Sequence, residues 1–347
     1  MRFLGLDLIR FFTFIAIVGW HFGTLLWDGQ PHYYPFHVES TGWWAYYMYT
    51  HGFANGGFVV LALSFFLFGL KDKGFKYSGR FFALLVIGWF LLSGLEAILE
   101  GEFWISWDIY ALLISGVGLL AILPTQSMKA LRLLAIPSFA MTWFPFWYLL
   151  DLSDHPLLPW LVGTCDDSNH TWALFPWIGF LYIFFWLGRE ISILPSWTKN
   201  GLDIGRSEVV LWVLASLVSL PFLGVYLNVS GAQRECLMFR VVGWSFWAGM
   251  MPFLFLARLS LIPKVNEALK SLKFVSWVSR LQVNQRFWAV YLGHWPVLVA
   301  VVAVFQNQLR QSPLYSLVAV SLVYPVTEVL VWFAATKAKL LWFDKRG

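Results

Sequence analysis

The feature that most constrains the fold is a series of apolar runs, each close to the length of a membrane-spanning helix. A helix needs about 20 mostly apolar residues to cross the hydrocarbon core of a bilayer. The 347-residue chain is 59% hydrophobic and only 12% charged, whereas a soluble domain carries about 25% charged residues. The runs are continuous and lack the alternation of a membrane barrel. The sequence therefore predicts an all-α, polytopic helical bundle embedded in a membrane.

Ten spans account for the runs, and the predicted spans cover residues 4–27, 52–70, 80–97, 107–123, 132–150, 172–188, 208–227, 237–257, 287–305 and 314–335. Cytoplasmic loops of membrane proteins are enriched in Lys and Arg. If both termini are placed in the cytoplasm, every Lys and Arg of the chain falls on the cytoplasmic side except Arg234, Arg240 and Arg310. The charge pattern thus favours an even number of spans, and residues 1–347 are predicted to form a single transmembrane domain.

Two of the predicted spans have unusual features. The first contains Asp7 and Arg10 and is followed by no small-residue cleavage site, so we interpret it as a retained span and not as a signal peptide. The fifth contains Pro137 and Pro145, which interrupt its apolar pattern and make it the weakest of the ten.

The first span carries Arg10 and His21, eleven residues apart. On an α-helix this spacing is about 20° past three full turns and about 16.5 Å of rise, so both side chains lie on one face. Asp7, three residues before Arg10, is on nearly the same side and within reach of an ion pair. Ionisable residues inside a membrane span are costly and generally mark a functional site. The opposing interpretation is that Arg10 extends to the interface and His21 bonds a neighbouring helix.

Several motifs occur in order along the chain. They are "LDLIRFFTFIAIVGWHF" in the first span, "THGFANGGFVVLALSFFLFGLKDKGFKYSGRFFAL" across the second, "FPWIGFLYIFFWLGRE" in the sixth and "VYLGHWPVLV" in the ninth. Together they resemble the membrane acyltransferase-3 family, whose signature is an Arg and a His separated by ten residues in the first span. The family that acylates heparan-type glucosamine or periplasmic glucans is similar.

This resemblance implies an enzyme that moves an acyl group, most simply acetyl, from cytoplasmic acyl-CoA to a carbohydrate or glycolipid acceptor. It points to Arg10 and His21 as the catalytic residues. In place of the family's Arg-x-x-Arg pair in the first inner loop, this chain has Lys73, Lys76 and Arg80. Lysine binds phosphate as a point charge and without the planar fork of arginine. These three residues are the candidates for binding acyl-CoA, although an inner loop is expected to be basic in any case.

The residue types suit acyl transfer on their own chemistry. A histidine near neutral pH can remove the proton of an acceptor hydroxyl, or take up the acyl group itself and pass it on. The sequence leaves both roles open for His21. Arg10, near the cytoplasmic end of the same face, suits the phosphates or carbonyls of CoA.

A second polar group lies in the last two spans. His294 follows Tyr291 by one turn in the ninth span, and Glu328 should lie at a similar depth in the tenth, which runs in the opposite direction. We expect these residues to support catalysis or to fasten the two helices together. The rival function is a proton-coupled transporter or flippase, in which His21, His294 and Glu328 would relay protons.

The remaining features define the setting. Neither a metal motif nor a nucleotide-binding loop is present, and the net charge of +5 reflects inner loops and not nucleic-acid binding. The predicted location is the bacterial cytoplasmic (inner) membrane.

Residues 258–286, the longest inner connection, mix Leu, Val and Trp with Lys and Arg and suggest an amphipathic helix on the membrane surface. Cys165 and Cys236 both fall near the outer side, which is compatible with a disulfide. Oligomeric state is not encoded in these patterns.

Overall fold

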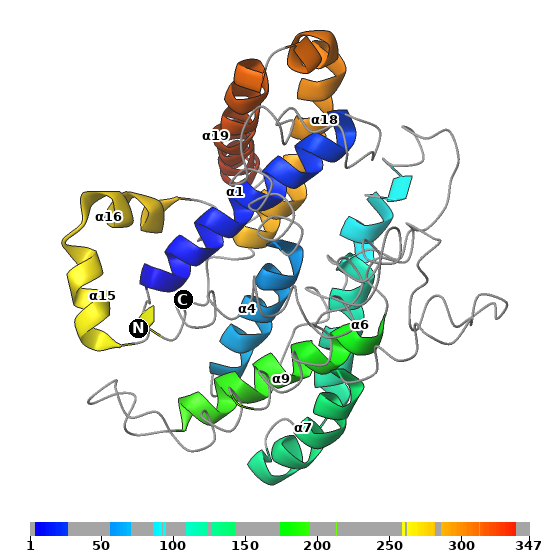
Figure 1. Ribbon diagram of the computed structural model, residues 1–347, viewed down its shortest axis with the longest axis vertical. Coiled ribbons are helices and arrows are strands. Elements are labelled where there is room, and N and C mark those ends of the chain that lie inside the picture. The colour runs from blue at the N-terminus through cyan, green and yellow to red at the C-terminus, as the bar shows by residue number, and fades with distance from the viewer. Residues whose placement is uncertain are drawn as a thin grey trace, which may run out of the picture. The chain divides into compact units, whose positions relative to one another are not determined.

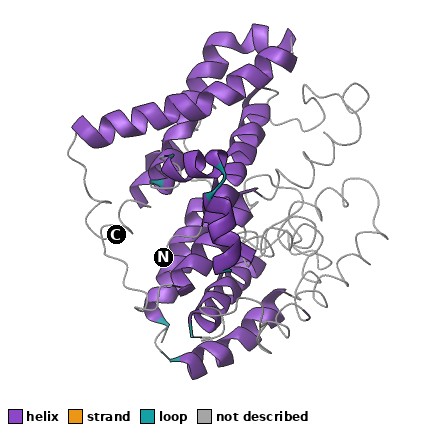
Figure 2. Ribbon diagram, turned by 90° about the vertical axis from the view of Figure 1, so that its left-hand side faces the viewer, coloured by secondary structure: helices purple, strands orange, loops and turns teal. Residues whose placement is uncertain are grey.

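The computed structural model describes residues 4–26, 56–70, 86–91, 93–94, 109–123, 127–142, 174–193, 213, 259–260, 262–281, 286–311 and 313–337. Within these ranges the chain is helical and contains no strand, as Figure 2 shows. The all-α part of the prediction is thus confirmed for the described residues. No helix among them combines the length and the apolar character that crossing a membrane requires.

The main helices are labelled in Figure 1, and their bounds are α1 Leu4–Leu26, α4 Gly56–Leu70, α6 Ile109–Ile122, α7 Met128–Thr142, α9 Leu174–Ser192, α15 Pro263–Lys270, α16 Lys273–Arg280, α18 Phe287–Gln311 and α19 Pro313–Lys337. The chain divides into two compact units. The terminal unit joins Met1–Gly57 to Pro252–Gly347, and the central unit is Phe58–Met251. The N-terminal helix therefore packs with the last part of the chain. Whether the whole chain acts as one domain stays a prediction.

Most of the described helices lie where the apolar runs predicted them, with different ends. The fifth predicted span begins earlier, because α7 starts at Met128, and Pro137 lies inside this helix without ending it. α18 continues to Gln311 through polar residues that were expected to lie in a loop. α19 then begins with Pro313, which is well tolerated in the first turn, where the backbone N–H has no helical partner. The predicted spans 208–227 and 237–257 lie outside the described residues, apart from residue 213.

The central unit contains a very close crossing of α4 and α9. A Cβ atom on Gly69 would lie 2.1 Å from the carbonyl oxygen of Phe185, and one on Gly188 would lie 2.1 Å from the carbonyl oxygen of Phe66. No side chain fits at these distances, so glycine at both positions allows the two backbones to touch. Small residues serve this purpose at helix–helix contacts in membranes.

α7 and α9 of the central unit are joined by polar contacts. Arg132 donates two hydrogen bonds to the carboxylate of Glu190, from Nε to Oε1 at 2.5 Å and from Nη2 to Oε2 at 2.8 Å. The indole N–H of Trp186 also donates to Glu190 Oε1, at 3.0 Å. Nearby, the Tyr182 hydroxyl donates to the carbonyl oxygen of Leu131 at 3.2 Å. Because Arg132 lies near the start of α7 and Glu190 near the end of α9, the two helices run antiparallel.

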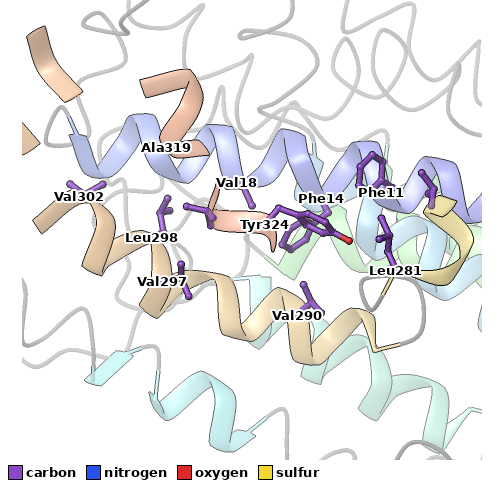
Figure 3. Close-up of a cluster of buried hydrophobic side chains, with 12 residues drawn as sticks. Phe11, Phe14, Val18, Leu281, Val290, Val297, Leu298, Val302, Ala319 and Tyr324 are labelled. Atoms are coloured by element: carbon purple, nitrogen blue, oxygen red, sulfur yellow. The ribbon is translucent and has the colours of Figure 1, made fainter. Parts of the chain in front are cut away.

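The core of the terminal unit is built by α1, α16, α18 and α19. Figure 3 shows its buried side chains, and their full set is Phe11, Phe14, Val18, Val278, Leu281, Val290, Val297, Leu298, Val302, Ala319, Val323 and Tyr324. α1 contributes Phe11, Phe14 and Val18, at the spacing of four and three residues that keeps one helical face buried. This row on α1 fixes which of its faces meets α18 and α19.

Candidate functional site

The N-terminal turn of α1 is held by the segment before α16. The backbone N–H of Leu4 donates to Oδ1 of Asn266, a buried residue of α15, at 2.8 Å. This bond satisfies one of the four N–H groups that the first turn of a helix leaves without a partner. A Cβ atom on Gly5 would lie only 2.1 Å from Cβ of Ser260, so the chain before α15 packs directly on α1. No pattern in the sequence predicts this arrangement, since Leu4 and Asn266 are 262 positions apart.

Arg10 and Asp7 form the ion pair that their spacing predicted. Nη1 of Arg10 lies 3.8 Å from Oδ1 of Asp7, and the two side chains are 27% and 5% exposed, respectively. Asp7 is thus buried, whereas the guanidinium of Arg10 reaches the surface of the described part of the unit. The carboxylate can thus orient the guanidinium of Arg10.

His21 lies in α1, beyond the last of the buried core residues of that helix. It follows Phe14 by seven residues and Val18 by three, so the helical repeat places position 21 on the same line. The side chain of His21 is outside what the structure describes. Positions 10 and 21 thus lie on one continuous helix, and a shared face for the side chains of Arg10 and His21 stays a prediction.

His294 is buried completely in the same core. Its Nδ1 bonds the carbonyl oxygen of Tyr291, one turn earlier on α18. A carbonyl oxygen can only accept, so Nδ1 is the donor and the lone pair of the neutral ring is at Nε2. The imidazole also lies 5.4 Å from the Tyr291 ring, which confirms that the two residues share a face.

Phe14 connects His294 to the last helix. Its ring lies 5.5 Å from that of His294 and 5.5 Å from that of Tyr324, in edge-on arrangements with both. Figure 3 shows Phe14 and Tyr324 meeting between α1 and α18. The carboxylate of Glu328, one turn later on α19, lies near enough to act electrostatically on the Tyr324 hydroxyl, which makes no hydrogen bond to the described residues. Phe14 and Tyr324 were not among the predicted site residues, because a buried aromatic residue is ordinary in an apolar sequence.

The predicted depth of Glu328 agrees with the packing of α18 on α19. A Cβ atom on Gly293 would lie 3.3 Å from Val331 and 3.4 Å from Thr327, and these residues flank Glu328 in the sequence. Position 293 therefore lies level with this part of α19. Glu328 lies near the Tyr324 hydroxyl, and a direct pair between His294 and Glu328 stays a prediction.

These contacts place His294 between the two signature positions of α1. Phe14, which touches His294, is four residues after Arg10 and seven before His21. On a helix these separations are about 6 Å and about 10 Å of rise. The terminal unit therefore brings a buried imidazole to the level of α1 that separates Arg10 from His21.

Arg286 is a further residue with a buried polar atom, and the sequence did not single it out. It lies immediately before α18, and its Nη1 is buried with no hydrogen-bond partner among the described residues. No local pattern marks it, because burial of a residue beside a helix end depends on distant segments.

The other predicted residues lie outside the described ranges. This applies to the candidate acyl-CoA ligands Lys73, Lys76 and Arg80 and to both cysteines, Cys165 and Cys236. Comparison with known proteins found no family model, no curated protein and no solved structure that matches the chain. The likeness to the membrane acyltransferase-3 family therefore rests on the motifs quoted above.

Proposed function

We propose that the chain is an integral membrane acyltransferase that moves an acyl group, most simply acetyl, from cytoplasmic acyl-CoA to a hydroxyl or amine of a cell-surface or periplasmic carbohydrate. The observation that carries the proposal is the placement of His294. The buried row of α1, formed by Phe11, Phe14 and Val18, packs on α18 and α19, and it brings the imidazole of His294 to the level of α1 between positions 10 and 21.

The membrane setting is supported by apolar surface as well as by composition. Outward-facing apolar residues form a continuous row along α19, at spacings of three or four, and they are Tyr315, Val318, Leu322, Val326, Val329 and Phe333. Each exposes between 44% and 62% of its surface, while the opposite face of α19 is buried in the core. A helix that is apolar on both faces suits a bilayer better than water. Because the described helices alone do not reach the length and apolarity of a span, this setting also depends on the complete apolar runs of the sequence.

Acyl transfer gives each predicted residue a place in the reaction. A base removes the proton of the acceptor hydroxyl or amine, the freed electron pair attacks the thioester carbonyl, the carbon–sulfur bond breaks, and CoA leaves as a thiolate that takes up a proton. His21 acts as the base or carries the acyl group between donor and acceptor. Arg10, oriented by Asp7, binds the donor. His294, with Tyr291 and Glu328, supports the centre, and Lys73, Lys76 and Arg80 bind the CoA phosphates.

The test is a transfer assay on the full chain in proteoliposomes. Radiolabelled acetyl-CoA is supplied, and CoA release and label on the protein or on added glycan are followed for wild type, His21→Ala and Arg10→Ala. Loss of a general base typically lowers a rate by about 10²–10⁴-fold, which is the result expected for His21→Ala. Ile15→Val, on an outward position of the same helix, is the matched control and should retain full activity.

The rival function, a proton-coupled transporter or flippase, is favoured by one observation: the complete burial of an ionisable residue, His294, beside an aromatic cluster. It predicts solute movement that follows a proton gradient and needs no acyl-CoA. If folded wild type neither binds nor consumes acetyl-CoA, and His21→Ala behaves like wild type in the assay above, the acyltransferase proposal is wrong and the transporter should be tested first.

A further inference from the structure

The segment Pro263–Arg280, formed by α15 and α16, has three separate faces. On α16 the buried residues are Val275, Val278 and Ser279. Phe274 and Trp277 lie about 60° apart on the helix and are each close to half exposed. The aromatic pair therefore borders the buried face directly, and about half of each ring residue stays exposed.

The third face of α16 is basic. Lys273 and Arg280 are seven residues apart, so they lie within about 20° of one another on the helix. They lie on the other side of the aromatic pair from the buried residues, and both are exposed. Around α16, the buried face is thus followed by the aromatic face and then by the basic face.

The basic character extends along the whole segment. Between Pro263 and Arg280 the charged residues are Lys264, Glu267, Lys270, Lys273 and Arg280, so basic residues outnumber acidic ones four to one. All five are exposed, and Leu272, between the two helices, exposes 52% of its surface. Exposed apolar and aromatic side chains beside a row of cations are typical of helices that lie in the membrane–water interface.

The segment is attached to the helix that carries the predicted catalytic pair. Phe11 of α1 contacts the rings of Phe274 and Trp277, at 6.3 Å and 5.9 Å between centroids. Phe12, which is itself half exposed, contacts Phe274 at 6.4 Å. In Figure 1, α15 and α16 lie beside the first turns of α1. The exposed aromatic surface therefore continues from α16 onto the start of α1.

We propose that Pro263–Arg280 docks on an anionic bilayer surface, with Leu272, Phe274 and Trp277 in the interface and the lysines and arginine against lipid phosphates. This inference depends on the membrane setting of the proposed function but not on acyl transfer. An anionic leaflet is the occupant that satisfies both the apolar face and the excess of positive charge, since the cytoplasmic leaflet attracts basic segments that flank a span. Through its contacts with Leu4 and Phe11, the docked segment would also hold the inner end of α1 at the membrane surface.

The experiment measures where single labelled positions lie in the full chain. In a Cys165→Ser/Cys236→Ser background, an environment-sensitive fluorophore is attached to Leu272→Cys, Phe274→Cys or, as the control on an exposed polar position, Glu267→Cys. The proteins are reconstituted into nanodiscs of phosphatidylcholine with or without phosphatidylglycerol. Quenching is measured with a nitroxide on shallow lipid chains and with iodide in the water.

The expected result is lipid quenching several-fold stronger at positions 272 and 274 than at position 267, with the reverse order for iodide. Phosphatidylglycerol should increase the lipid quenching, and Lys270→Gln/Lys273→Gln should lose that increase. Because Leu272→Cys disturbs no ring contact, it gives a result even if Phe274→Cys alters packing.

Two results would overturn the proposal. One is equal accessibility of all three positions to iodide in both lipids. The other is shielding of positions 272 and 274 from both quenchers, which would indicate a protein contact in place of lipid. Acetyl transfer by the same samples is measured in parallel, so that loss of transfer with intact lipid quenching affects only the proposed enzyme, and the opposite pattern affects only the docking surface.

Discussion

The helix contacts of the two units are built in different ways. In the central unit, α4 and α9 touch through Gly69 and Gly188, and α7 is joined to α9 by the Arg132–Glu190 pair. Polar groups here bind one another in fixed geometry, and the backbones are too close to admit any side chain. These are the properties of a scaffold.

In the terminal unit, three helices meet through Phe14, His294 and Tyr324. An imidazole and a phenol are buried there against an aromatic ring, and Glu328 lies beside them. Burying such groups costs free energy that an apolar residue of similar size would not. The difference teaches that substitutions in the central unit should change stability alone, while volume-conserving substitutions in the terminal unit should also change the reaction.

The largest effect is expected for Phe14. Replacing it with Ala removes the ring between His294 and Tyr324 and should cost about 3–5 kcal/mol of unfolding free energy. Phe14→Leu keeps much of the volume and loses mainly the ring contacts, which are worth about 1 kcal/mol. We expect this milder variant to lower acetyl transfer more than about tenfold, because the neighbour that positions His294 is gone. Unfolding in denaturant and transfer from acetyl-CoA measure the two quantities.

The matched control for Phe14→Leu is Phe65→Leu in the central unit, where the wild-type ring is also almost fully buried. It should lose similar stability and retain full transfer per folded molecule. Equal losses of transfer in the two variants would remove the distinction between the units.

Next comes the glycine contact of the central unit. Gly188→Ala places a Cβ atom 2.1 Å from a backbone oxygen of Phe66, so α4 and α9 must separate, at a cost of about 3 kcal/mol. Gly118→Ala, on α6, meets no atom within 4 Å and should be neutral or stabilising by up to about 1 kcal/mol. Thermal unfolding of the two variants in detergent gives the comparison. A Gly188→Ala protein as stable as wild type would show that the helices are not in backbone contact.

The sequence predicted those parts of both units that depend on local pattern. Apolar runs located the helices, and the helical repeat placed Arg10 beside Asp7 and His294 beside Tyr291. Helix ends were predicted less well: a single proline such as Pro137 does not end a helix that neighbours hold in place.

Contacts between distant segments could not be predicted. Leu4 and Asn266 are far apart in the sequence, as are Arg132 and Glu190, and no repeat within a helix reveals which residue it will meet on another. For the same reason the sequence does not distinguish Phe14 from the other aromatic residues of the first apolar run. What the sequence supplied for the site was the residue types and their spacing on one helix, while the burial of His294 between Phe14 and Tyr291 required the fold.

A smaller effect is expected for Glu190. Glu190→Gln keeps the shape of the side chain and removes its charge, so that Arg132 loses its ionic partner. Because the Arg132 side chain is 55% exposed, water compensates part of the loss, and we expect about 1–2 kcal/mol of destabilisation. Arg132→Lys, which cannot bind both carboxylate oxygens at once, should cost a similar amount. Neither variant should alter the KM for acetyl-CoA, and a raised KM would place this ion pair in the donor site.

The smallest effect on stability, and the most informative one about mechanism, is expected for Asp7. The Asp7 side chain is 5% exposed, so the desolvation cost of its charge offsets much of its attraction to Arg10, which is 27% exposed and lies 3.8 Å away. Asp7→Asn keeps the shape of the side chain and should therefore unfold nearly as wild type does. If Asp7 orients Arg10 toward the donor, the same variant should raise the KM for acetyl-CoA several-fold and leave kcat almost unchanged. In the Arg10→Ala background Asp7→Asn should then add nothing, since residues that act through one another are not additive. A further rise of KM in the double variant would show that Asp7 acts on the site independently of Arg10.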